Sequence, residues 1–145
     1  MDFRKPSFFF GGGVDLFFLR YQYFRDIETE SSGSKQQILL RHRLSLSKQI
    51  FLNMSLGLEY SDRRFNNYYY GVRPHEVIRS RPLYTPKGDW SPITGITAIM
   101  SINERWSSII GLNYKILSAQ VKNSPTVIKS TKVTSFLGIS YRLTK

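Results

Sequence analysis

The chain has 145 residues and a formal net charge of +11, with 41% hydrophobic and 14% aromatic residues and no cysteine. This length is enough for one domain with its own core. The missing cysteines exclude a disulfide framework, a cysteine-based zinc site and a thiol nucleophile. No stretch reaches the roughly 18 consecutive apolar residues of a membrane-spanning helix. The mean hydropathy of −0.29 does not exclude a transmembrane barrel, because barrel strands are apolar only at every second position.

The N-terminal segment lacks the long apolar region of a signal peptide. Residues 1–5 carry the charges of a signal n-region, but the apolar run at 8–10 is short and soon meets Asp15 and Arg20. We therefore predict no signal peptide here. The glycines at 11–13 indicate a break before the first strand.

Alternating apolar and polar residues predict six strands, since successive side chains of a strand leave opposite faces. The expected strands are 14–24, 35–46, 50–60, 92–102, 106–117 and 133–143. The clearest pattern lies in 50–60, where one face is apolar from Ile50 to Tyr60 and the other carries Asn53, Ser55, Gly57 and Glu59. Strands of this length suit a tilted bilayer crossing of about 9–11 residues. Helix is expected to be minor and confined to the long loop 61–90.

The connections between these strands alternate in length. The longer ones, at 26–34, 61–90 and 118–132, all fall on one end of the sheet, and the short turns fall on the other, where both termini are expected too. Outer-membrane barrels have this layout, with long loops outside and tight turns in the periplasm. A soluble sandwich or lipocalin-like barrel shares the alternation but not the regular loop asymmetry.

The two faces of the predicted strands also favour a membrane barrel. The polar face is rich in Asn, Ser, Gly and Thr, which suits a lumen, and four basic residues are expected on it: Arg41, Arg43, Lys115 and Arg142. Four aromatic residues are expected at the membrane interface: Tyr60, Trp106, Tyr114 and Tyr141. The sequence therefore predicts an all-β, antiparallel transmembrane barrel.

Three segments together resemble one family of bacterial envelope proteins. They are Asn67–Val72 with Arg81–Tyr84, the hairpin Ile102–Gly111, and Asn123–Val127 with Gly138–Arg142. In order and spacing they are similar to the MipA/OmpV family of Gram-negative outer-membrane proteins. The resemblance implies an outer-membrane β-barrel and, as partners, outer-membrane lipids and the murein-synthesising and murein-degrading enzymes that the best-known member links.

The sequence departs from the family in two respects. Family members are longer, begin with a signal peptide and have more strands, so residues 1–145 are expected to form a single β-barrel domain that is truncated at its N-terminus. The family also ends on an aromatic residue after Tyr-Arg, where this chain has Leu143 followed by two further residues. This difference predicts less efficient barrel assembly.

No motif for catalysis, metal binding or a cofactor is present in the sequence. The two histidines, His42 and His75, lack metal-ligand spacing, and there is no Gly-x-Ser-x-Gly motif or phosphate-binding glycine loop. We predict no catalytic residue, no metal ligand, no cofactor and no enzymatic activity.

Three functions remain open from the sequence. The first is a non-enzymatic outer-membrane scaffold or envelope-interaction protein. The second is a small outer-membrane channel for small solutes, with its selectivity set by the basic lumen residues. The third is a soluble basic β-domain that binds nucleic acid, which the membrane features disfavour; nucleic acid is not expected as a partner.

Closure of the barrel is the last expectation from the sequence. Six strands are two short of the smallest familiar barrels. The chain should therefore form an open sheet with 14–24 and 133–143 as its edges. Exposed edges and apolar faces promote aggregation, so the chain alone should be insoluble, or need upstream strands or a second copy.

Overall fold

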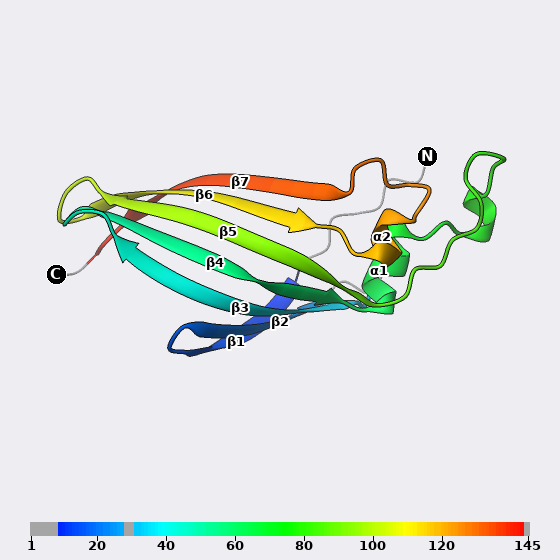
Figure 1. The fold of residues 1–145 in the computed structure, drawn as a ribbon, viewed down its shortest axis with the longest axis horizontal. Coiled ribbons are helices and arrows are strands. Elements are labelled where there is room, and N and C mark those ends of the chain that lie inside the picture. The colour runs from blue at the N-terminus through cyan, green and yellow to red at the C-terminus, as the bar shows by residue number, and fades with distance from the viewer. Residues whose placement is uncertain (1–8, 28–30, 144–145) are drawn as a thin grey trace.

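A single antiparallel sheet of seven strands forms the molecule (Figure 1). The computed structural model describes residues 9–27 and 31–143. The strands pair in sequence order, each with its neighbours along the chain. Their bounds are β1 Phe9–Leu16, β2 Leu19–Asp26, β3 Ser34–Ser45, β4 Ile50–Ser61, β5 Asp89–Ser101, β6 Trp106–Ile116 and β7 Thr131–Tyr141. The predicted all-β, antiparallel class is confirmed.

Within the described ranges, three short helices lie in two of the long connections. Helix α1 (Arg63–Tyr70) and the 3-10 helix η1 (Pro74–Glu76) follow β4, and α2 (Ala119–Lys122) follows β6. The expectation that helix is confined to the first of these loops was wrong for α2. Its start is explained locally, because the Ser118 side chain accepts a hydrogen bond from the Val121 amide. No helix in the described ranges is both long and apolar enough to span a membrane.

The largest difference from the predicted strands is at the N-terminal end. The expected strand 14–24 is a hairpin, and the glycines at 11–13 lie within β1 instead of ending it. A Cβ on Gly11 would lie 2.2 Å from the Tyr23 carbonyl oxygen, so glycine permits the close pairing of the two strands. The turn is at Phe17, whose φ of 52° is rare for an aromatic residue. An unusual turn residue and a glycine run within a strand conceal this hairpin in the sequence.

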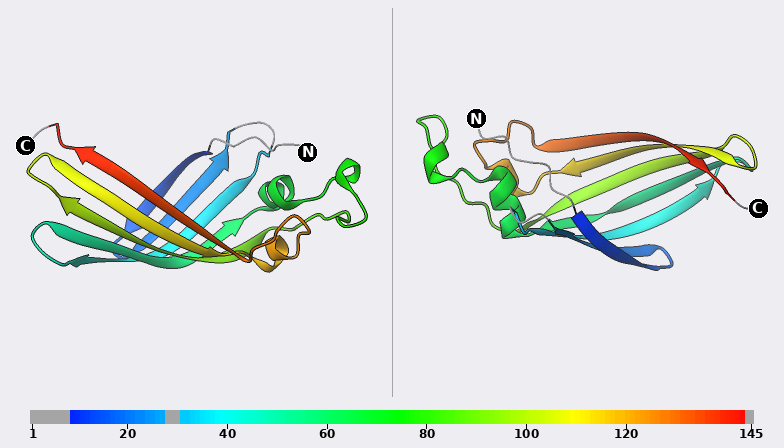
Figure 2. Two further views of the ribbon diagram at one scale, coloured as in Figure 1. Left: turned by 90° about the horizontal axis from the view of Figure 1, so that it is seen from above. Right: turned by 180° about the vertical axis from the view of Figure 1, so that it is seen from behind.

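The extra strand changes the position of the N-terminal strand. Strand β1 begins beside the long loops, where Phe9 pairs with Asp26, whereas β7 ends beside the short turns (Figure 2). We expected both termini at the short-turn end, and this expectation was wrong for the N-terminal strand. Because the number of strands is odd, the two edge strands run in the same direction. Strands β3 to β7 agree with the predicted ranges within a few residues.

Side-chain hydrogen bonds stabilise the turn between β3 and β4 and the turn between β5 and β6. Asn103 Oδ1 accepts hydrogen bonds from the amides of Arg105 and Trp106, each at 2.9 Å. Ser47 Oγ accepts from the amides of Gln49 at 3.2 Å and Ile50 at 3.1 Å. Asn and Ser at these positions satisfy amides that the sheet leaves unpaired, so the turns fix the register of both hairpins.

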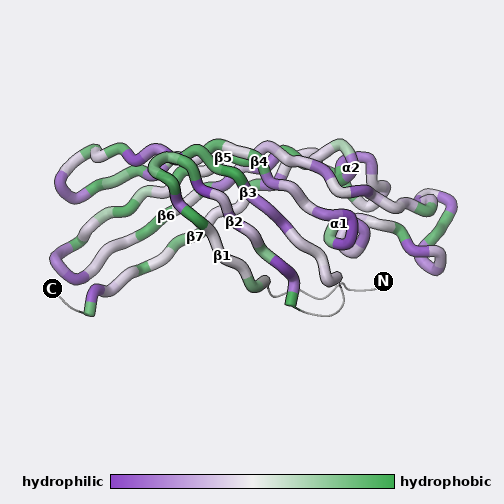
Figure 3. Tube along the Cα trace, turned by 90° about the horizontal axis from the view of Figure 1, so that it is seen from below, coloured by the Kyte–Doolittle hydropathy of each residue, from purple (hydrophilic) through white to green (hydrophobic). Residues whose placement is uncertain are grey.

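Hydropathy alternates along most strands of the curved sheet (Figure 3). Because successive side chains of a strand leave opposite faces, the two faces of the sheet differ in polarity. We call the face with Ile38, Met54, Ile96, Leu112 and Leu137 the outer face, and the opposite one the inner face. These five outer-face side chains are 37–79% exposed. The register joins several of them into a continuous apolar surface, since Met54 pairs with Ile96 and Ile96 with Leu112.

Aromatic pairs lie at both ends of the outer face. The rings of Tyr60 and Trp90 are 5.2 Å apart at the long-loop end, and those of Trp106 and Tyr141 are 4.8 Å apart at the short-turn end. Trp106 lies opposite Ile102, so the two aromatic pairs are separated by about 12 residues of β5, or about 40 Å along the strand. At the usual barrel tilt this is about 30 Å, close to the thickness of the hydrocarbon core.

The buried apolar side chains lie at the long-loop end and not between the strands. Among the described residues they are Phe65, Tyr68, Val72, Leu117 and Val121. The molecule exposes 10583 Å² of surface, whereas a compact protein of this mass would expose about 7,700 Å². The sheet thus leaves its apolar face uncovered, and that face requires an apolar environment.

The sheet is open, as expected, but its first edge is β1 and not the segment 14–24. Among the described residues β1 pairs only with β2, and β7 only with β6. A second copy could be related to the first by a rotation axis that runs along the strands. In that arrangement β7 of one copy would pair with β1 of the other in parallel, whereas every other pair in the sheet is antiparallel.

We expect the chain alone to aggregate in water, as measured by gel filtration without detergent. A monodisperse, detergent-free monomer would contradict this.

Candidate binding site at the long-loop end of the inner face

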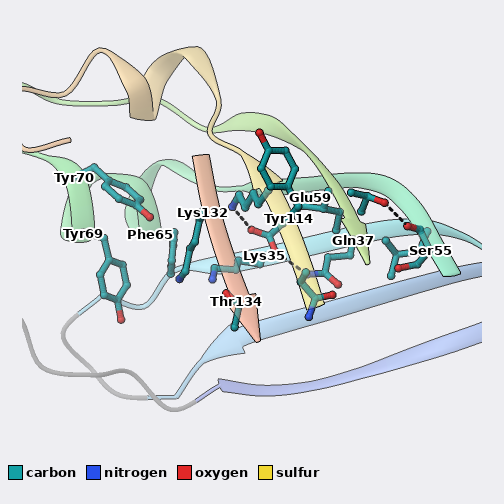
Figure 4. Close-up of a pocket in the computed structure, with 15 residues that line it drawn as sticks. Lys35, Gln37, Ser55, Glu59, Phe65, Tyr69, Tyr70, Tyr114, Lys132 and Thr134 are labelled. Carbon is teal, nitrogen blue, oxygen red and sulfur yellow. Dashed lines mark hydrogen bonds and ion pairs between the residues drawn. The ribbon is translucent and has the colours of Figure 1, made fainter. Parts of the chain in front are cut away.

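Charged side chains from four strands meet on the inner face near the long loops (Figure 4). The register sets Lys115 directly opposite Lys132, and Gln37 directly opposite Glu59. Together with Lys35 they line a cavity of about 530 Å³. Residues that share one face of a sheet are thereby brought together from positions up to 97 apart in sequence.

Glu59 is the acidic centre of this cavity. It is only 7% exposed, and Lys115 Nζ forms an ion pair with its Oε1. The other carboxylate oxygen, Oε2, accepts a hydrogen bond of 2.6 Å from Gln37 Nε2. A buried carboxylate is tolerated when it is paired and hydrogen-bonded in this way. These contacts join β3, β4 and β6 across the inner face.

Helix α1 closes the long-loop end of the cavity. Asp62 caps the helix, with Oδ1 accepting from the Phe65 amide at 2.8 Å. Its Oδ2 accepts from the amide and the hydroxyl of Ser34, at 2.9 Å and 2.8 Å. One carboxylate therefore both starts the helix and attaches it to the beginning of β3.

Aromatic residues of α1 form the wall above the charged groups. The Lys35 ammonium lies 4.0 Å from the centre of the Phe65 ring, a cation–π distance. Tyr69 and Tyr70 also line the cavity. Burial raises the pKa of the Tyr70 hydroxyl above its ordinary value, and Glu59 and Tyr69 act in the same direction. Tyr70 is therefore a neutral hydrogen-bond donor at physiological pH.

The two long loops that carry the helices are joined by hydrogen bonds. The fully buried Asn66 donates from Nδ2 to the carbonyls of Ser61 at 3.3 Å and Lys87 at 2.8 Å, which joins the two ends of the first loop. Tyr84 Oη donates to the Gln120 carbonyl at 2.7 Å, and Ser124 Oγ to the Tyr70 carbonyl at 2.5 Å. The sequence suggested an irregular connection here, but the loops form an ordered cap.

The four basic residues predicted on the inner face all lie there, but at different places. Arg41 lies with Arg20 around Asp15, at 2.9 Å and 2.6 Å. Arg43 stacks on the Phe51 ring at 4.4 Å. Arg142 lies at the short-turn end with Arg105 and Ser107, and Lys115 is in the long-loop cavity. Lys35, Lys132 and Glu59 were not singled out as a group. The period-2 pattern places Lys35 and Glu59 on the polar face, whereas Lys132 fell in the predicted loop 118–132 and lies in β7.

The described part of the chain holds no group of three or more histidine, cysteine, aspartate or glutamate residues able to bind a metal ion. His42 lies on the outer face of β3 and His75 in η1, so they do not meet. The aromatic and basic residues at 63–70 form α1, whose Phe65 and Tyr68 are buried. The rings of Phe65 and Tyr68 are therefore not exposed for nucleic-acid bases to stack on.

Comparison with known proteins identifies the family. The model of the family described as MltA-interacting protein MipA matches residues 1–143. The chain belongs to the MipA family. The resemblance inferred from the sequence motifs is thereby confirmed.

Several relatives are similar over most of this chain. It is 34% identical to MltA-interacting protein of Escherichia coli K12 over 148 aligned positions, covering 98% of this chain and 59% of the relative. It is 30% identical to outer membrane protein Omp26La of Vibrio anguillarum over 131 positions, with coverage of 88% and 51%. Outer membrane protein OmpV of Vibrio cholerae is 28% identical, with the same coverage. The chain spans about half the length of the relatives it matches. No solved structure matches significantly.

The family and the fold agree on location. Several relatives are named as outer-membrane proteins, and the outer face of the sheet has the exposed apolar surface and aromatic ends that a bilayer requires. The MipA-family protein is therefore an all-β outer-membrane protein. This location argues against a soluble nucleic-acid-binding domain.

Proposed function

We propose that this MipA-family protein is a non-enzymatic scaffold of the outer membrane whose partner is a murein-degrading enzyme. The name of the E. coli relative, MltA-interacting protein, supports this partner. A murein-synthesising enzyme would be the second partner that such a scaffold joins to the first.

The ion pairs of the acidic side chains on the inner face are the observation that supports this proposal. Glu59 is held by Lys115 and Gln37, and Asp15 is held by Arg20 and Arg41. These two acidic groups are thus engaged in contacts that connect strands. Groups that serve in acid–base chemistry need access to a substrate proton, whereas groups that join strands stiffen a sheet. This arrangement suits a rigid support.

The short-turn end is where a periplasmic enzyme would bind. In outer-membrane barrels the long loops face outward and the tight turns face the periplasm, where murein lies. The turn between β3 and β4 includes the exposed Lys48. Arg79, at the other end of the molecule, is also exposed and basic, and makes a matched control.

Site-specific photo-crosslinking in cells tests both the partner and the orientation. With a crosslinking residue at Lys48, we expect a covalent product with a murein-degrading enzyme, identified by mass spectrometry. The same residue at Arg79 should give no such product. Crosslinking from Arg79 alone would reverse the proposed orientation, and no enzyme product from either position would contradict the scaffold function.

A small solute channel is the second candidate, and one observation favours it. The inner face is polar and carries more basic than acidic side chains both in the long-loop cavity and around Asp15. A lumen lined in this way would conduct anions better than cations. Planar-bilayer recordings of a full-length relative should then show anion-selective current, and an absence of conductance would count against a channel.

A further inference from the structure

The inner-face cavity has more positive than negative charge among its described lining residues. Lys35, Lys115 and Lys132 face a single carboxylate, that of Glu59. Glu59 is already engaged on both oxygens, by Lys115 and by Gln37. It is therefore not available to Lys132. Lys132 is thus a charged group of this cavity that no described carboxylate neutralises.

The position of Lys132 is unfavourable without a further anion. Its partner across the β6–β7 ladder is Lys115, and like charges directly opposite each other on one face destabilise a strand pair. The Lys132 side chain makes no ion pair or hydrogen bond with another described residue. An anion between the two lysines would relieve their repulsion.

Neutral donors lie next to this lysine pair. Asn113 and Thr134 face each other one step further along the same ladder, on the same inner face. Both line the cavity, and within the described ranges neither side chain has a hydrogen-bond partner. Tyr69 and Tyr70 of α1 add aromatic surface and hydroxyl groups on the opposite wall. A volume of about 530 Å³ is in the range of small-molecule sites.

We propose that this cavity binds a small organic dianion, either a phosphate monoester or a dicarboxylate. Lys132 and Lys115 pair with the anionic group, Asn113 and Thr134 donate hydrogen bonds to it, and the tyrosines contact the uncharged part of the solute. Two negative charges on one solute allow it to pair with both Lys132 and Lys115, which lie directly opposite each other. This site goes beyond both candidate functions and does not depend on a protein partner.

The test is calorimetric titration of the full chain in detergent micelles at low salt. Glycerol 3-phosphate and succinate are the two dianion probes, and glycerol is the neutral one. We expect saturable binding of at least one dianion and none of glycerol. Since a hydrogen bond to a charged group is worth about 1.5 kcal/mol or more, Lys132→Gln should weaken binding about tenfold. Thr134→Val, which keeps the charge, should weaken it about threefold.

Lys48→Gln is the matched control, because it removes the same charge at the far end of the sheet. It should leave the affinity unchanged. The proposal is overturned if neither dianion binds, if glycerol binds equally well, or if Lys132→Gln has no effect. Equal weakening by Lys48→Gln would also overturn it, because binding would then depend on overall charge alone. Circular dichroism of each variant verifies that the sheet is retained.

Discussion

Ile96→Arg is expected to abolish assembly of the protein into the outer membrane. Ile96 is midway between the two aromatic pairs of the outer face, is 42% exposed, and neighbours Met54 and Leu112 across the ladders. It therefore lies near the bilayer midplane. An arginine on the lipid face at this depth costs about 2–4 kcal/mol, which is a large share of the stability of a small domain.

The adjacent Thr97 provides the control, because its side chain leaves the opposite face of the same strand. Thr97→Arg places the same charge on the polar inner face and should retain most of the assembly. Assembly is measured by outer-membrane fractionation and by heat-modifiable migration on gels. Equal loss in both variants, or normal assembly of Ile96→Arg, would show that the outer face does not meet lipid.

Lys115→Met should be the most destabilising change on the inner face. It removes the ion-pair partner of Glu59 and leaves a buried carboxylate with only the Gln37 hydrogen bond. Breaking a buried pair from one side typically costs about 3–5 kcal/mol. Urea unfolding of the micelle-folded protein measures the loss.

Two further variants separate the cause of this loss. Adding Glu59→Gln to Lys115→Met removes the uncompensated charge and should restore most of the stability. Lys132→Met removes a neighbouring lysine that has no described partner, and should change the free energy of unfolding by less than about 0.5 kcal/mol. If the double variant were no more stable than Lys115→Met alone, the charge on Glu59 would not be the reason for the loss.

The sequence was informative where strand alternation is regular. Strands β3 to β7 follow from apolar residues at every second position, because one face of each must be apolar and the other polar. The same alternation correctly separated Arg41 and Lys115 from the outer-face aromatic residues. The family motifs in the loops were also recognisable, because they keep their order and spacing.

The hairpin β1–β2 was missed because its turn lacks a typical turn residue and its first strand contains three glycines. A turn at Phe17 has none of the glycine or asparagine that a positive φ normally requires. The glycines at 11–13 suggested a break, but they allow a close strand pair. This miss altered the strand count, and with it the position of the N-terminal strand relative to β7.

The loop cap and the lysine cavity depend on contacts between distant residues. Asp62 meets Ser34, and Asn66 meets the Lys87 carbonyl, only once the strands have brought the loops together. Likewise, Lys115 and Lys132 face each other because of the β6–β7 register, which alternation alone does not specify. The face of Lys115 was predictable, but its partner was not, and Lys132 fell in a predicted loop.

Cysteine accessibility along β5 tests the central structural claim most directly. The chain has no cysteine, so single substitutions from residue 91 to residue 101 give a clean background. In intact outer membranes, a water-soluble maleimide should label the inner-face positions 93, 95, 97 and 99. Positions 94, 96, 98 and 100 face lipid and should remain unlabelled until the membrane is dissolved. Uniform labelling, or labelling with a helical period, would contradict a sheet that spans the outer membrane with one face in lipid.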